Sequence, residues 1–437
     1  MWTNWSGGQS CVPAAIEAPR TRAEVGAAVQ RAAAAGRTVR VAGAGHSFSG
    51  AALTDGVLLR LDALDRVLDA DPAAGLVRVE AGIRLRALNR ALLARGLALP
   101  NLGDIDVQSL AGALATATHG TGGRLPNLSA QVAAVELVLA DGSERTLTEA
   151  DGDLLRAARV GLGALGVVVA VTLRCVPAFR LHAVDAPEPL ERVLDELDER
   201  VERNDHFELF TFPHSRVAIT RTNNRTDAPA RPPGAARTWV DEVLVENHVF
   251  GALNRAGRRA PRVIPWLNRA AGAAASRRER VDEAFRVFAT ERRVRFEELE
   301  HAVPRERARE ALLTCREILA RHPVGFPLEL RFTAADDALL SPAHARPSAY
   351  VAAHVFAGIP YAAPLREVEA ALSALGGRPH WGKRSWLGAA ELAPRYPRWE
   401  AFAAARAQLD PEGRFANAFV ERILGAGRTA AATAGAA

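Results

Sequence analysis

The sequence has few cysteines and almost no lysine. Its three cysteines, Cys11, Cys175 and Cys315, lie far apart and include no Cys-x-x-Cys pair. They predict neither a disulfide framework nor a cysteine zinc site, and we expect no metal centre. A chain of this kind fits a reducing compartment, so a cytoplasmic location is expected.

Long apolar runs are also absent. No stretch stays apolar for the roughly 18 residues that a membrane-spanning helix needs, and the N-terminus lacks the segments of a secretory signal. We expect a protein that is soluble, or at most peripheral to a membrane through its arginine-rich helical region.

Charge is nearly balanced, with 55 basic and 50 acidic residues. The arginine clusters at 277–280 and 292–295 lie among Asp and Glu, which favours solvated faces over nucleic-acid binding. No nucleic-acid partner is expected.

The chain's length and its change of pattern near Pro177 indicate more than one domain. At 437 residues and 49% hydrophobic composition it is too long for one compact core. In the first ~180 residues, short β-rich runs alternate with helical patterns. We expect strands at 38–42 and 76–80 and a hairpin turning at Asp141-Gly142. One helix carries Val25, Ala28, Val29 and Ala32 on a single face and ends at Gly36, and a second is expected near 85–93.

Beyond Pro177 the pattern predicts an antiparallel sheet covered by helices, which makes the fold class α+β. The strands are expected at 207–212, 217–222, 294–298, 328–333 and 350–356, and the helices at 305–321 and 365–375. The tail from Gly425 to Ala437 is almost only Gly, Ala and Thr, and is expected to be disordered.

Two segments combine glycine with histidine: Gly43-Ala44-Gly45-His46-Ser47 and Thr116-Ala117-Thr118-His119-Gly120-Thr121-Gly122. Glycine lets backbone N–H groups approach a pyrophosphate closely. Neither segment is a Rossmann or Walker motif, and a single glycine-rich turn is most often structural. Two of them in one predicted domain favour a nucleotide-like ligand.

Lys383 is the only lysine among the 55 basic residues. Arginine replaces lysine easily on a surface, but not where a compact ammonium must sit beside a reacting group. On the strand predicted at 328–333, Glu329 and Arg331 share one face, opposite the apolar Leu328, Leu330 and Phe332. The charged face forms either a surface ion pair or a preorganised site.

Six segments, in this order, resemble the FAD-linked oxidases of the vanillyl-alcohol oxidase superfamily, and above all its aldonolactone oxidoreductases. The resemblance runs from about Trp5 to Leu424. The segments are Gly-Ala-Gly-His-Ser-Phe-Ser from Gly43, Thr-His-Gly-Thr-Gly from Thr118, Leu-Gly-Ala-Leu-Gly-Val-Val from Leu162, Glu-Leu-Arg-Phe from Glu329, His-Trp-Gly-Lys from His380 and Leu-Asp-Pro-Glu-Gly-Arg-Phe-Ala-Asn from Leu409.

The resemblance implies FAD, joined covalently through a ring nitrogen of His46. It implies an FAD-binding domain of the PCMH type over 1–178, a substrate domain over 179–384, a C-terminal segment over 385–424 that packs back on the first domain, and the tail 425–437. The residues it places along the cofactor are Ala42, Gly43, Ala44, Gly45, His46, Ser47, Asp104, Gly112, Thr116, Thr118, His119, Gly120, Thr121, Gly166, Val167 and Val168.

On the substrate side the resemblance implies Glu329, Arg331 and Lys383, with His354 and His380 as further candidates for substrate contact or proton transfer. Arg331 and Lys383 would stabilise negative charge, and Glu329 would orient Arg331 and bind substrate hydroxyls. Many relatives have a histidine two residues after the lysine, where this chain has Ser385.

Three functions stay open. The first is oxidation of an aldono-1,4-lactone (gulono-, galactono- or arabinono-lactone) to an ascorbate-type product, with oxygen or another electron acceptor. The second is oxidation of an open-chain polyol such as xylitol or sorbitol. The third is a noncatalytic flavin- or nucleotide-binding protein, against which the single retained Lys383 argues.

Overall fold

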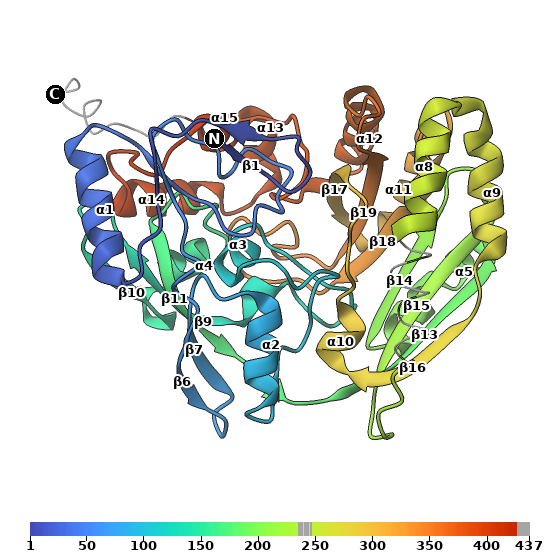
Figure 1. The fold of residues 1–437 in the computed structure, drawn as a ribbon, viewed down its shortest axis with the longest axis horizontal. Helices are drawn as coiled ribbons and strands as arrows, with labels where there is room; N and C mark the ends of the chain where they lie inside the picture. Colours follow the sequence, from blue (N-terminus) through green and yellow to red (C-terminus); the bar gives the residue numbers. More distant parts are fainter. Residues whose placement is uncertain (235–238, 240–243, 245–246, 426–437) are drawn as a thin grey trace.

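The computed structural model describes residues 1–234, 239, 244 and 247–425 (Figure 1). The tail expected to be disordered lies outside the described residues from position 426 onward. Within the described part no helix is both long and apolar enough to cross a membrane. The three cysteines are unpaired.

The N-terminal part combines a small parallel sheet with a larger antiparallel one. The parallel sheet has the order β3 (Ala15–Glu17), β5 (Val57–Leu59), β4 (Val39–Val41). Helix α1 (Arg22–Ala34) begins after Thr21, whose side chain accepts a hydrogen bond from the Glu24 N–H. Its buried face carries the Val and Ala residues that repeat with helical spacing.

The antiparallel sheet has the order β10-β9-β11-β7-β6. The predicted hairpin at Asp141-Gly142 joins β9 to β10, and the predicted helix over 85–93 is α2 (Leu85–Leu93). Helices α3 (Leu110–Ala115) and α4 (Asp153–Arg159) belong to the same part of the chain. The strands are β6 (Val67–Asp71), β7 (Leu76–Glu80), β9 (Val132–Val138), β10 (Glu144–Leu147) and β11 (Val167–Arg174).

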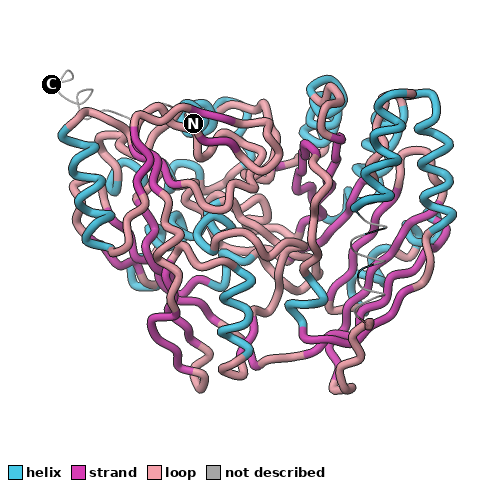
Figure 2. Tube along the Cα trace, viewed as in Figure 1, coloured by secondary structure: helices cyan, strands magenta, loops and turns pink. Residues whose placement is uncertain are grey.

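The middle of the chain forms an eight-stranded antiparallel sheet with the order β16-β13-β15-β14-β18-β19-β17-β20 (Figure 2). The α+β fold class is therefore confirmed. The strands are β13 (Arg180–Pro189), β14 (His206–Thr211), β15 (Val217–Thr226), β16 (Arg278–Glu283), β17 (Phe296–Pro304), β18 (Leu328–Thr333), β19 (Ser348–Phe356) and β20 (Arg378–Pro379). The strand expected at 294–298 begins two residues later and is longer.

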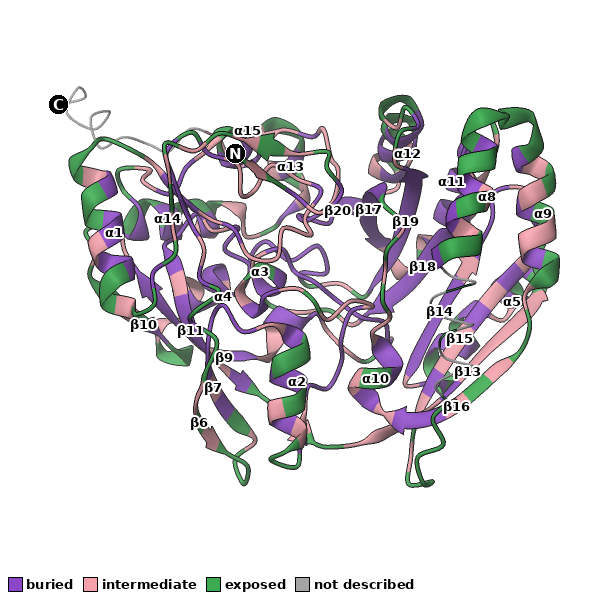
Figure 3. Ribbon diagram, viewed as in Figure 1, coloured by how far each residue is buried: buried purple, intermediate pink, exposed green. Residues whose placement is uncertain are grey.

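Helices cover one face of this sheet. Helices α5 (Leu190–Asp195), α6 (Leu197–Arg203), α11 (Ala308–Ala320) and α12 (Ala362–Ala374) pack their apolar residues against Leu328, Leu330, Phe332 and Val351. The central strands are buried on both faces (Figure 3). The face that carries Glu329 and Arg331 is therefore buried too, so these two side chains do not form a surface ion pair.

Two further helices, α8 (Phe250–Arg259) and α9 (Ile264–Ala274), stand at the outer edge of the large sheet in Figure 1. Each buries one face and exposes the other (Figure 3).

The C-terminal helices α13 (Ala389–Leu392), α14 (Trp399–Leu409) and α15 (Ala418–Leu424) return to the N-terminal part of the chain. Helix α14 packs on α4, and Figure 1 shows the red end of the chain beside the blue beginning. Asn417 donates from its side-chain amide to the carbonyls of Gly50 and Leu53. These contacts fix the loop that follows Ser49.

Candidate active site

The loop from Gly43 to Ser47 follows strand β4 and presents free backbone donors. In the described part of the chain, none of its five N–H groups donates to a protein acceptor. Gly45 has φ +74°, a conformation that favours glycine, and a Cβ on Gly43 would lie 2.1 Å from Ser109 Oγ. A close-packed loop with free N–H groups is suited to bind a pyrophosphate.

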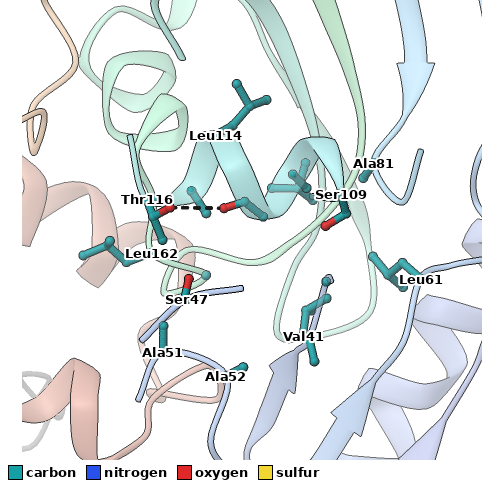
Figure 4. Close-up of a pocket in the computed structure, with 18 of the residues that line it drawn as sticks. Val41, Ser47, Ala51, Ala52, Leu61, Ala81, Ser109, Leu114, Thr116 and Leu162 are labelled. Atoms are coloured by element: carbon teal, nitrogen blue, oxygen red, sulfur yellow. Dashed lines mark hydrogen bonds between the residues drawn. The ribbon is translucent and has the colours of Figure 1, made fainter. Parts of the chain in front are cut away.

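A long cavity of about 1350 Å³ begins at this loop. Its wall is mostly apolar and made of small residues, as Figure 4 shows around Ala51, Ala81 and Ser109. Thr116 closes one end of α3 and donates to the Gly112 carbonyl, 3.3 Å away. The small side chains and the free N–H groups fit an extended dinucleotide cofactor.

A second cavity of about 790 Å³ adjoins the first. The two share wall residues His46, Ser47, Gln108 and Thr116. The second is far more polar: its wall includes Asp104, His119, Arg292, Glu298, Glu300, Glu329, Arg331, His354, His380 and Lys383. A ligand that spans the shared wall would meet these charges.

Strand register brings the charges together. On β17 the side chains of Glu298 and Glu300 point to one face, and Glu298 lies opposite His354 of β19. Glu329 of β18 lies opposite Ala352 of β19, which also lies opposite Glu300. The small Ala352 thus leaves space at the centre of a ring of charged residues.

Lys383 reaches this ring from the loop after β20. Its Nζ lies 2.5 Å from Glu298 Oε1 and 3.9 Å from Glu300 Oε2. Burial alone would lower the pKa of Lys383, but Glu298 and Glu300 raise it above its ordinary value. The ammonium therefore stays charged inside the cavity.

Arg331 is held by carboxylates on three sides. It pairs with Glu329, its Nε lies 2.9 Å from Glu208 Oε2, and its Nη2 lies 3.6 Å from Asp104 Oδ2. Burial would raise the pKa of Asp104, but Arg292, which pairs with it, and Arg331 hold it below its ordinary value. Glu329 differs: burial raises its pKa to about 7 despite Arg331.

The histidines form a second group. His119 Nε2 lies 3.3 Å from Glu300 Oε1, and ligand atoms of His119, Glu300 and His380 lie within 4.8 Å of one another. These three could hold a metal ion, but Lys383 beside Glu300 opposes a cation there. Burial lowers the pKa of His380 to about 3 and, with Arg84 and Lys383, lowers that of His46 to about 4.

Most residues expected at the site line one of the two cavities. Ala42, Gly43, Gly45, Gly112, Gly166 and Val168 line the first, and Asp104, Thr118, His119 and the five substrate-side candidates line the second. Four others lie outside both linings. Val167 points into the core with Val138, Gly120 packs on Leu102, Thr121 Oγ1 bonds the Phe207 carbonyl, and Ala44 is the fourth.

Ser385 also lies outside both cavity linings. Its Oγ accepts from the Leu387 N–H, 3.3 Å away, and it bonds Glu369. The position at which the resemblance implies a histidine therefore does not line either cavity in this chain.

Several site residues were missed from the sequence. Glu298 ends the strand predicted at 294–298, but Glu300 lies beyond that prediction, and Glu297 next to Glu298 obscures the alternation. The expectation that the cluster at 292–295 is a solvated face is wrong for Arg292, which lines the second cavity and pairs with Asp104. Only the pairing of distant segments reveals that contact.

Comparison with known proteins gives one consistent result. The family model for D-arabinono-1,4-lactone oxidase matches residues 171–423, and that for the FAD binding domain matches 13–148. L-Gulono-1,4-lactone dehydrogenase of Mycobacterium tuberculosis is 47% identical over 427 residues, which are 97% of this chain and 99% of that protein. Alditol oxidase of a Streptomyces species is 34% identical over 442 residues, which are 97% and 98%.

Among solved structures, cholesterol oxidase from B. sterolicum superposes with a TM-score of 0.80 at 18% identity, over 97% of this chain and 96% of that one. At that identity the likeness concerns the fold alone. With both family models and a relative of nearly equal length in agreement, the chain belongs to the FAD-dependent aldonolactone oxidoreductases of the vanillyl-alcohol oxidase superfamily.

Proposed function

We propose that this protein oxidises an aldono-1,4-lactone at C2, with L-gulono-1,4-lactone as the preferred substrate and an ascorbate-type product. The observation that carries this proposal is the 47% identity, over nearly the full length of both chains, to an L-gulono-1,4-lactone dehydrogenase. The charged second cavity beside the wall of His46 supplies a chemically suitable site.

Bound FAD would supply a hydride acceptor. The first cavity and the free N–H groups of residues 43–47 would hold its pyrophosphate and adenine portion. Gly112, Thr116, Gly166 and Val168 would line it, with Asp104, Thr118 and His119 toward the substrate side.

His46 would be the covalent anchor. Formation of a bond needs an unprotonated ring nitrogen, and burial, Arg84 and Lys383 lower the pKa of His46 to about 4. The imidazole is therefore neutral at physiological pH. His46→Ala should convert acid-stable flavin into flavin that acid precipitation releases, whereas a variant that still retains acid-stable flavin would contradict the linkage.

On the substrate side, Arg331 and Lys383 would stabilise the negative charge that develops on the C2 oxygen as the hydroxyl proton leaves. Glu329 would orient Arg331 and accept a hydrogen bond from a substrate hydroxyl. His354 and His380 line the same cavity and would contact the substrate ring. Glu329, Arg331, His354 and His380 are buried and Lys383 is half-buried, and limited contact with water strengthens their interactions.

The alternative substrate is an open-chain polyol, which the 34% identity to an alditol oxidase keeps open. Turnover with an artificial acceptor should be compared for gulono-, galactono- and arabinono-lactone against xylitol and sorbitol. We expect the lactones to be the better substrates. Turnover of xylitol or sorbitol alone would overturn the lactone proposal and leave the flavin chemistry intact.

Turnover without the artificial acceptor, compared in the presence and absence of oxygen, would show whether oxygen is the electron acceptor.

We also propose that the chain divides functionally into an FAD-binding domain over 1–178, a substrate domain over 179–384 and a C-terminal segment over 385–424.

A peripheral membrane contact through α8 and α9 belongs to this proposal. Residues 247–278 contain seven arginines and no Asp or Glu. Trp266 is 67% exposed and Val263 is 38% exposed on the same helical pair. Arginines beside an exposed tryptophan suit the headgroup layer of an anionic bilayer.

A further inference from the structure

The N-terminal hairpin holds the loop that carries His46. Strands β1 (Trp2–Thr3) and β2 (Ser10–Cys11) pair, and the turn between them packs on residues 45–48. The Trp5 N–H donates to the Gly45 carbonyl (2.7 Å), the Asn4 amide to the Ser47 carbonyl (3.0 Å) and the Gln9 amide to the Phe48 carbonyl (3.2 Å). The hairpin thus binds the carbonyl side of the loop and leaves its N–H side open.

Within this hairpin, the Trp5 side chain stacks on the His46 imidazole. The ring centroids are 5.3 Å apart and the planes differ by 24°. Trp5 is fixed in turn by the edges of Phe296, at 5.4 Å and 73°, and Phe48, at 6.4 Å and 85°. A fixed indole that covers one face of the imidazole restricts it to one orientation. Without the indole, the His46 side chain would be free to adopt several rotamers.

We propose that Trp5 is a positioning residue for covalent flavin attachment, and that its indole holds the His46 ring with one nitrogen directed along the wall shared by the two cavities. This inference rests on the proposed linkage through His46. Both residues line the second cavity, and His46 lines the first as well. Trp5 touches no reacting atom and acts through His46.

Formation of the bond between His46 and the flavin would release two protons and two electrons. The unprotonated nitrogen of the neutral His46 ring would bond to the flavin 8α carbon in place of one methyl hydrogen, which would leave as a proton. The N–H proton of the other ring nitrogen would also leave. The two electrons of the broken C–H bond stay on the flavin and pass to the electron acceptor of the enzyme's own turnover. Orientation of the nitrogen toward the methyl carbon is the contribution that the stack makes.

The role can be separated from a merely structural one, because the three hydrogen bonds to residues 45–48 do not involve the indole. Trp5→Ala therefore removes the stack and leaves the loop held. Trp5→Phe keeps an aromatic face, and Trp5→Leu keeps volume without one. Trp239→Ala, at an exposed site, is a matched tryptophan control.

The test uses full-length protein from riboflavin-depleted cells, supplied with FAD. The measurement is the rate at which flavin becomes covalently attached, read as the flavin that stays with the protein after acid precipitation. The total FAD bound before precipitation is measured alongside. We expect Trp5→Ala and Trp5→Leu to bind FAD but attach it about tenfold more slowly or worse. Trp5→Phe and Trp239→Ala should stay close to the unsubstituted protein.

Attachment at the unsubstituted rate in Trp5→Ala would overturn the inference. If Trp5→Ala does not fold, Trp5→Leu decides by the same criterion. Unsubstituted protein that releases all of its flavin on precipitation would instead overturn the His46 linkage, and this inference with it. The two failures are therefore distinguishable.

Discussion

Lys383 is unusual both in the composition of the chain and in its position in the structure. All the remaining Lys and Arg positions of the chain are arginine, but Lys383 keeps an ammonium group, which lies 2.5 Å from Glu298 in the second cavity. A guanidinium there would need more room and more acceptors than a single point charge. The carboxylates that keep Lys383 protonated also keep it in place.

Lys383→Met should leave FAD bound but slow flavin reduction by the substrate about tenfold or more, or about 1.4 kcal/mol in barrier, because the developing oxygen charge loses its cation. Anaerobic stopped-flow absorbance measures this rate. Arg384→Met is the matched control, since Arg384 pairs with Glu297 and lies outside both cavity linings. Full reduction rates in Lys383→Met would remove Lys383 from the proposed chemistry.

Glu329 should give the reaction a pH dependence. Burial raises its pKa to about 7, so below that pH the carboxyl is protonated, loses its charge and is a weaker acceptor for a substrate hydroxyl. The rate of flavin reduction should therefore rise with pH through about 7. Glu329→Gln should lower the rate and remove this rise from a plot of rate against pH. If the rise persists unchanged in Glu329→Gln, a group other than Glu329 causes it.

At the residue scale, five predicted substrate-side candidates line the second cavity. Lys383 stood out by composition and Glu329 and Arg331 by alternation, whereas His354 and His380 came from the family resemblance. It could not predict Arg292 or Glu208. Arg292 reaches Asp104 across 188 positions, and Glu208 reaches Arg331 from a strand with no charge pattern of its own. Such contacts depend on how distant segments pair.

Among the elements, the strands were easier to predict than their neighbours. The expected strand at 328–333 has the bounds of β18, and its apolar face does pack on helices. The order β14-β18-β19-β17, however, places β18 between β19, the next strand in the chain, and β14, which lies far earlier in the sequence. That order, and not any single strand, puts Ala352 between Glu300 and Glu329.

Helices α8 and α9 should bind anionic bilayers. Vesicle co-sedimentation at physiological salt should capture the protein with phosphatidylglycerol-containing vesicles and much less with phosphatidylcholine alone. Gln at Arg255, Arg259 and Arg262, or Ser at Trp266, should reduce capture. Gln at Arg192, Arg307 and Arg309 removes the same charge from arginines paired with carboxylates and should not. Equal capture by all variants, or capture by nucleic acid instead, would contradict the membrane contact.

Across the whole molecule, two cavities meet at a wall of four shared residues that includes His46. His46 and Ser47 of the glycine loop, together with Gln108 and Thr116, make that wall, and the large sheet with the Lys383 loop supplies charged residues of the second cavity. The C-terminal helices complete the arrangement by packing back on α4 and on the loop after Ser49. The sequence predicted each part, but only the fold shows that the parts adjoin.

The central claim is that a sugar lactone in the second cavity reduces a flavin held in the first. Anaerobic mixing of the purified protein with L-gulono-1,4-lactone, followed by flavin absorbance, tests it most directly. We predict that the absorbance of oxidised flavin is lost in a single turnover without any added acceptor, and that xylitol acts more slowly. Protein that carries FAD but keeps its full oxidised absorbance with gulono-, galactono- and arabinono-lactone would contradict the account.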